Sequence, residues 1–148
     1  MSYLNVFEST GRFLAFGADR ALVWALMERG WTGVYVRETE AGQAPGLVPI
    51  VGVLTTDPRL VQTLDGYYVR SLTIEDIFKQ FPGPYDLIAA IGTGRDREIW
   101  HHECVFNALP KMYVLGEDGH NEEVMKVAAD RGYDKVNASD GHLVLVHQ

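Results

Sequence analysis

The densest group of residues able to do chemistry lies at positions 101–104, where two histidines are followed by a glutamate and a cysteine. Imidazole, carboxylate and thiolate groups are the usual zinc ligands. Neighbouring residues diverge by about 100° around a helix, so only Glu98 and His101 share a face here. Structural zinc needs four protein ligands and catalytic zinc three, so the sequence predicts no metal site.

Cys104 and the remaining histidines are the candidate catalytic groups. A Cys–His nucleophilic pair at Cys104 lacks a visible third member or an oxyanion loop, which favours a buried free thiol. His120 follows a predicted strand and could act as a base, although an exposed loop histidine is the commoner case. His142 and His147 are predicted on a strand surface, and all three tryptophans, at positions 24, 31 and 100, are predicted to serve packing.

A second group of candidates follows the ends of apolar runs. Gly17 ends the run at residues 13–16, and Gly92 ends the nearly all-apolar run at residues 86–91. Open α/β sheets bind ligands outside the carboxyl ends of their strands, and glycine lets the backbone approach a ligand closely. The loops at Gly17 and Gly92 are therefore candidate ligand-binding loops, although Gly92 could equally serve a plain turn.

Two aspartates near these loops have alternative interpretations. Asp19 could contact a cofactor, but an aspartate just before a helix is foremost an N-cap that accepts amide hydrogen bonds of the first turn. Asp57 could reach the adenine side of a nucleotide pocket, yet an aspartate followed by proline also begins short helical turns. The capping interpretation is favoured at both positions.

Composition and charge limit the classes of function. The 148 residues fit one domain, and 47% apolar with 22% charged residues is ordinary globular chemistry. A net charge of -7 argues against nucleic-acid binding and against an anionic membrane surface, both of which select clustered lysine and arginine. No apolar stretch is long enough to span a bilayer, and the single cysteine requires no oxidising compartment. A protein of the cytoplasm is expected.

The elements alternate between strand and helix along most of the chain. Residues 13–16 and 33–36 are predicted strands, and the helix between them, residues 21–27, is apolar on every side and stops at Gly30. Later helices are predicted from Thr73, whose surroundings form a capping pattern, over residues 95–107 and over residues 121–131. Further strands are predicted at residues 49–54, 86–91 and 112–115, with an antiparallel hairpin of residues 133–137 and 143–146 around an Asp-Gly turn. The run at residues 86–91 is expected at the sheet centre.

This alternation predicts an α/β fold with a single domain over residues 1–148. Right-handed crossovers place helices on both faces of a mostly parallel sheet, giving three layers. Seven strands that end in an antiparallel hairpin select the Rossmann-like methyltransferase fold among such sheets.

Several segments, in their order along the chain, resemble the FkbM family of S-adenosylmethionine-dependent methyltransferases. A Gly-Ala loop at residues 17–18 precedes a Gly-Trp-x-Gly-Val step at residues 30–34. Segments at residues 69–78, 85–88, 109–115 and 121–133 follow in family order, so the resemblance covers most of residues 11–147. It implies an S-adenosylmethionine site formed by Gly17, Ala18, Asp19, Arg37, Glu38, Asp57 and Gly92.

The chain departs from the family pattern where the cofactor should bind. The family has an acid in the first strand and a second glycine in the following turn, where this chain has Ala15 and the pair Arg20-Ala21. A carboxylate that accepts both ribose hydroxyls normally ends the second strand, but Arg37 stands there and Glu38 comes one residue late. The family's Asp-x-Glu-Gly after the fourth strand is replaced by residues 91–94, Ile-Gly-Thr-Gly.

These departures lead to three hypotheses. The first is a methyltransferase-like domain with an eroded cofactor site that serves as a non-catalytic binding, assembly or interaction module. The second is an active S-adenosylmethionine-dependent O-methyltransferase of small or sugar-like substrates, in which Glu38 replaces the missing carboxylate. The third is a nucleotide-binding protein in which Arg37 binds a phosphorylated ribose. S-adenosylmethionine is the only cofactor that the first two imply, no metal is expected, and the partner is a small molecule or a protein, including a second copy of the chain.

Overall fold

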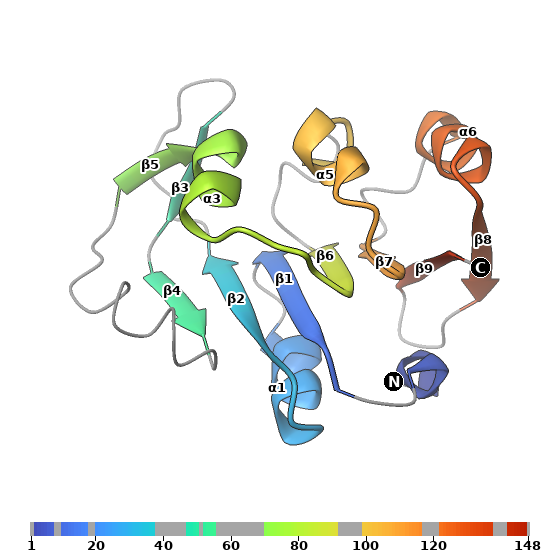
Figure 1. The fold of residues 1–148 in the computed structure, drawn as a ribbon, viewed down its shortest axis with the longest axis horizontal. Helices are drawn as coiled ribbons and strands as arrows, with labels where there is room; N and C mark the ends of the chain where they lie inside the picture. Colours follow the sequence, from blue (N-terminus) through green and yellow to red (C-terminus); the bar gives the residue numbers. More distant parts are fainter. Residues whose placement is uncertain are drawn as a thin grey trace.

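The chain folds as an α/β protein around a mixed sheet (Figure 1). The computed structural model describes residues 2–7, 10–17, 20–37, 47–50, 52–55, 70–91, 99–116, 122–137 and 142–147. The strands are β1 (Arg12–Gly17), β2 (Thr32–Arg37), β3 (Leu47–Ile50), β4 (Gly52–Thr55), β5 (Arg70–Thr73), β6 (Leu87–Ile91), β7 (Met112–Leu115), β8 (Tyr133–Asn137) and β9 (Leu143–His147). The helices are the 3-10 helix η1 (Ser2–Val6) and the α-helices α1 (Arg20–Glu28), α3 (Ile74–Gln80), α5 (Glu103–Asn107) and α6 (Glu122–Asp130).

The main sheet has the strand order β4-β2-β1-β6-β7-β9-β8. Strand β1 pairs in parallel with β2 and with β6, and β6 pairs in parallel with β7. The pairs β2–β4, β7–β9 and β8–β9 are antiparallel, so the sheet is mixed. The expected α/β class and the terminal hairpin are confirmed, and β6 lies at the centre of the order, as its apolar run predicted.

The single strand predicted at residues 49–54 is wrong. Two strands occupy this region, and they belong to different sheets: β3 pairs with β5 in a separate two-stranded sheet, whereas β4 joins the edge of the main sheet. Because β4 runs antiparallel to β2, the chain needs no helical crossover to reach it.

Helices cover both faces of the main sheet, with α1 on one side and α3, α5 and α6 on the other (Figure 1). The central strand shows this directly, because its side chains alternate between two apolar cores. Leu87 and Ala89 join a core with residues of η1 and α1, whereas Ile88 and Ala90 join a core with residues of α3, α5 and α6. Within the described part of the chain, no helix is both long and apolar enough to cross a membrane.

Helix α1 is covered on one side only, contrary to the prediction of an all-round buried helix. Leu22 and Leu26 are 1% and 0% exposed against the sheet, but Trp24 is 56% exposed on the outer face. The prediction that every tryptophan serves packing is therefore wrong for Trp24 and correct for Trp31 and Trp100. The outer face remains open because η1 is the only other helix among the described elements that shares the core of α1, and it does not cover Trp24.

Helix ends follow the sequence signals closely, with one exception. Gly30 and Gly132 adopt φ values of 84° and 87° just after α1 and α6, a conformation that glycine reaches without steric cost. The helix predicted over residues 95–107 is interrupted: residues 99 and 100 are helical, and α5 begins again at Glu103. His102 lies between them in an extended conformation, with φ -75° and ψ 134°, and breaks the helix.

Gly33 in β2 leads to a first prediction about stability. A Cβ added at Gly33 would lie 2.2 Å from the carbonyl oxygen of Phe13 on the neighbouring strand β1. Gly33→Ala therefore forces the β1–β2 backbones apart and should lower the free energy of unfolding by about 2–3 kcal/mol, the upper part of the usual cost of overpacking. Urea denaturation followed by circular dichroism measures this change. Thr32→Ala, at the half-buried neighbouring position, is the control, and an equal loss in both variants would contradict the steric account.

Candidate functional site

The carboxyl ends of four parallel strands meet at one edge of the sheet, which we call the carboxyl edge. Gly17, the last residue of β1, is the register partner of Ile91, the last residue of β6. Phe16 pairs with Val36, so Arg37 at the end of β2 lies at the same edge. The chain leaves β7 there as well, because the N–H of Gly116 donates to the carbonyl of Ala90 at 3.1 Å.

The order of the strands reverses at this edge between β1 and β6. From β1 the chain continues to β2 on one side, and it later returns to β6 on the other side of β1. A reversal of this kind is the topological switch point at which open α/β sheets bind ligands. The sheet order therefore selects the ends of β1 and β6 as the place for a ligand.

The structure places two of the predicted site residues at this edge by their backbone positions, Gly17 and Arg37. The others, Ala18, Asp19, Glu38, Asp57 and Gly92, lie outside the described residues, so their roles stay predictions.

Ala15, the residue in the place of the family's first-strand acid, is in the core. It is 4% exposed, pairs with Tyr35 and Ala89 on the two neighbouring strands, and belongs to the core beneath α1. This position offers no carboxylate to a ligand.

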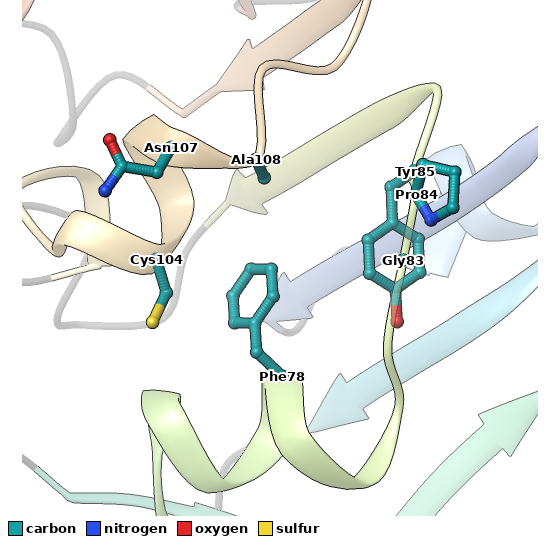
Figure 2. Close-up of a pocket in the computed structure, with 7 residues that line it drawn as sticks. All are labelled: Phe78, Gly83, Pro84, Tyr85, Cys104, Asn107 and Ala108. Atoms are coloured by element: carbon teal, nitrogen blue, oxygen red, sulfur yellow. The ribbon is translucent and has the colours of Figure 1, made fainter.

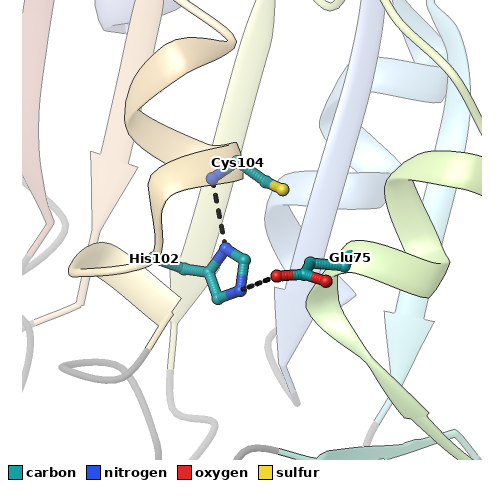
Figure 3. Close-up of polar contacts among 3 residues, drawn as sticks. All are labelled: Glu75, His102 and Cys104. Carbon is teal, nitrogen blue, oxygen red and sulfur yellow. Dashed lines mark hydrogen bonds and ion pairs between the residues drawn. The ribbon is translucent and has the colours of Figure 1, made fainter.

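A second cluster joins Cys104 and His102 with Glu75 of α3 (Figure 3). The backbone N–H of Cys104 donates to Nδ1 of His102 at 3.1 Å, and Nε2 of His102 lies 4.0 Å from Oε1 of Glu75. Sequence reasoning missed Glu75 as the third member, because only the packing of α3 against α5 brings it near residues 102–104. No local pattern in the sequence signals this neighbour.

The hydrogen bond within this cluster makes His102 the N-cap of α5. Nδ1 of His102 accepts from an amide of the first turn of α5, which is the contact that an N-cap side chain makes. The neutral ring then carries its proton on Nε2, on the side of Glu75. Both ring nitrogens thus face groups other than the thiol, so the ring is not oriented to take a proton from Sγ.

Electrostatics also disfavour a nucleophilic thiolate. Burial raises the pKa of the Cys104 thiol, and the negative charges of Glu75 and Glu103 raise it further. Reactive cysteines lie beside cations that lower the pKa of the thiol. Cys104 lies in the first turn of α5, but burial and the two carboxylates outweigh this position and leave the pKa raised. Among the described residues, no three His, Cys, Asp or Glu side chains are grouped so that they could hold a metal ion.

Cys104 also lines a pocket of about 260 Å³ between α3 and α5 (Figure 2). The walls are mostly apolar and include two aromatic rings, a proline and the thiol: Phe78, Gly83, Pro84, Tyr85, Cys104, Asn107 and Ala108. No local pattern in the sequence predicts this pocket, because its walls come from three separate segments of the chain: α3, the segment before β6 and α5.

His147 lies exposed on β9 as predicted, whereas His142 precedes β9 and is half-buried, so its prediction as a strand-surface residue is wrong. Each has an aromatic neighbour. Nδ1 of half-buried His142 is 3.0 Å from the hydroxyl of Tyr3, which ties η1 to the start of β9. The exposed ring of His147 packs edge-on against Tyr133, with ring centroids 5.0 Å apart. Both contacts are structural.

Comparisons of the chain with protein-family models, with curated proteins and with solved structures returned no match.

The surroundings of Cys104 lead to a prediction about its reactivity. Because the pKa of the Cys104 thiol is raised, alkylation by iodoacetamide at neutral pH should be slower than that of a small thiol. The rate should rise only at a pH above the usual pKa range of cysteine. Glu75→Gln removes a negative charge, so it should lower the pKa and speed the reaction, whereas Glu28→Gln on α1 should not.

His102→Ala separates the cap from a catalytic base. As a cap, His102 contributes about 1 kcal/mol to the free energy of unfolding, and its loss leaves the alkylation rate unchanged or higher. A tenfold slower alkylation in His102→Ala would show that the imidazole activates the thiol and would contradict the capping account.

Proposed function

We propose that this chain is a methyltransferase-like domain, related to the FkbM pattern, that binds a small molecule or a protein partner at its carboxyl edge without catalysing methyl transfer. One observation carries the proposal: the strand order reverses between β1 and β6, which puts the ends of both strands and Arg37 at a single edge. The terminal antiparallel hairpin of β8 and β9 also supports a methyltransferase-like sheet.

The loss of catalysis follows from the chemistry of the methyl donor. The sulfonium of S-adenosylmethionine is already activated, so an enzyme mainly aligns the methyl group with its acceptor. Tight binding of the cofactor is therefore essential. Here Ala15 stands buried in place of an acid, and Arg37 ends the strand that should supply the ribose carboxylate. Losing one bidentate charged contact costs about 2–5 kcal/mol, which converts micromolar affinity to roughly millimolar or weaker.

A second candidate function is an active S-adenosylmethionine-dependent O-methyltransferase of a small or sugar-like substrate. It is supported by the position of Arg37 at the carboxyl edge, because Glu38 is the next residue along the chain. In this function Glu38 supplies the ribose carboxylate that the family pattern places at the end of the second strand.

Calorimetric titration with S-adenosylmethionine and with its demethylated product separates the two functions. We expect no binding at micromolar concentration by the native chain. Micromolar binding that Glu38→Ala abolishes would overturn the non-catalytic proposal and support the enzyme.

Thermal-shift measurements with NAD and NADP extend this test to the third hypothesis. A ligand present at 100 times its dissociation constant stabilises a protein by about 2.7 kcal/mol, so even weak nucleotide binding becomes measurable. Stabilisation by NADP but not NAD, lost in Arg37→Ala, would assign the carboxyl edge to a phosphorylated ribose. The free thiol of Cys104 fits a reducing compartment, and we propose the cytoplasm as its location.

A further inference from the structure

Trp24 is the largest of the exposed apolar residues in the described part of the chain, and it lies on the outer face of α1. It is 56% exposed, whereas Leu22 and Leu26 of the same helix are buried against the sheet. Figure 1 shows α1 on the opposite side of the sheet from α3, α5 and α6. A single exposed apolar residue needs no explanation by itself, so the residues around Trp24 decide what this surface does.

The neighbours of Trp24 along α1 form a symmetrical pattern. Residues three and four positions away lie on the same face of a helix. Toward the N-terminus these are Ala21 and Arg20, and toward the C-terminus they are Met27 and Glu28. Ala21 and Glu28 are exposed, and Met27 is half-buried. The stripe therefore runs from a basic residue through three apolar residues to an acidic residue, with Trp24 at its centre.

A stripe with this order is complementary to itself. When two antiparallel helices are related by a two-fold axis at Trp24, each residue faces the one that lies equally far beyond Trp24 in the other copy. Arg20 of one copy then faces Glu28 of the other, and Ala21 faces Met27. A parallel pair would instead bring like charges together, which is unfavourable. The charges of α1 thus select a second, antiparallel copy of this chain as the occupant of this face.

The two charges are also placed against the dipole of their own helix. The N-terminus of a helix stabilises anions, and its C-terminus stabilises cations. Other helices follow this rule, with Glu103 and Glu122 in the first turns of α5 and α6 and Lys79 in the last turn of α3. Helix α1 instead begins with Arg20 and ends with Glu28. In an antiparallel pair each of these charges lies beside the opposite end of the partner helix, where the dipole favours it.

The arginine that follows α1 contacts a different element. The guanidinium of Arg29 donates to Oδ1 of Asn5 in η1 at 3.1 Å. This hydrogen bond directs the Arg29 side chain toward η1, so the stripe around Trp24 ends in the acidic residue Glu28.

The size of the contact sets its strength. Each copy contributes one helix of nine residues, fewer than the roughly 20–30 residues a side of a standard interface. We therefore expect a weak dimer, with a dissociation constant between roughly 10 µM and 1 mM.

We propose that this chain forms a two-fold dimer in which α1 packs antiparallel against α1 of a second copy, with Trp24 at the centre and Arg20 paired with Glu28 at each end. Burial of the tryptophan ring supplies the attraction, and the paired charges fix the orientation. The contact lies along the outer face of α1, so the inference does not depend on the function proposed at the carboxyl edge.

Sedimentation equilibrium of the native chain measures the association, at concentrations from about 10 µM to about 1 mM, which span the expected dissociation constant. The mean mass should rise from that of a monomer toward that of a dimer. Acrylamide quenching of fluorescence follows the same contact, because Trp31 and Trp100 are 3% and 1% exposed and Trp24 alone is accessible to the quencher. Quenching should therefore fall as the dimer forms.

Trp24→Ala tests the centre of the contact. This variant should weaken the dimer at least about tenfold, as expected for a central aromatic residue of an interface, and it should retain the circular dichroism spectrum. Leu109→Asn is the control, because Leu109 is also 56% exposed but lies between α5 and β7, and asparagine tolerates its φ of 45°. The control should dimerise like the native chain.

Reversal of the charges tests the orientation. Arg20→Glu and Glu28→Arg each replace two attractive pairs by two repulsive ones, so each variant alone should dimerise at least about tenfold more weakly. An equimolar mixture of the two variants should recover native association, because the arginines of one then face the glutamates of the other. The double variant Arg20→Glu, Glu28→Arg should also recover it. Each single variant should melt no lower than the native chain, since each places a charge that the dipole of α1 favours.

A native chain that stays monomeric at about 1 mM would overturn the proposal, since this is the weak limit of the expected range. If phosphatidylcholine vesicles then protect Trp24 from acrylamide, the face belongs to a lipid surface instead. A dimer that survives Trp24→Ala, or variants that do not recover when mixed, would show that the copies meet elsewhere or in another orientation and would also overturn it. These measurements use no added ligand, so their outcome is separate from the titration with S-adenosylmethionine.

Discussion

The parallel pairing of β1 with β6 is the constraint on which the rest of the molecule depends. Both strands are buried on both faces, so each needs helices above and below, and their side chains alternate between two separate cores. The same register fixes the two ends of the strands. Gly17 meets Ile91 at the carboxyl edge, and Arg12 meets Asp86 near the pocket at the amino edge.

The elements that the sequence predicted well are those whose signals are local. The apolar run at residues 112–115 forms β7 with the expected bounds, and Gly30 and Gly132 end their helices because glycine adopts the positive φ of each end without the steric cost of a Cβ. The elements it missed depend on distant partners. The apolar residues at positions 49–54 predict one strand, but pairing with β5 and with β2 divides them between two sheets. Likewise, periodicity could not show that the outer face of α1 lies open at Trp24.

The candidate sites also differ in whether local sequence signals or distant partners form them. Gly17 and Arg37 could be placed at one edge from the sequence, because carboxyl ends of parallel strands must lie together once the strands are identified. The pocket could not be predicted, because it forms where α3, the segment before β6 and α5 pack together. Glu75 stands beside Cys104 for the same reason: the apolar packing of Ile77 and Val105 into one core sets the position of both helices.

The cluster of Cys104, His102 and Glu75 shows that residue types alone do not make a catalytic site. Its chemistry depends on which atoms are hydrogen-bonded to one another. The three residue types are those of a nucleophile, a base and an orienting acid. Here the backbone amide of Cys104, not its thiol, occupies the imidazole, and the acid adds to the burial that keeps the thiol protonated. The negative charge of Glu75 thus opposes thiolate formation at Cys104, although the same three residue types in another arrangement would favour it.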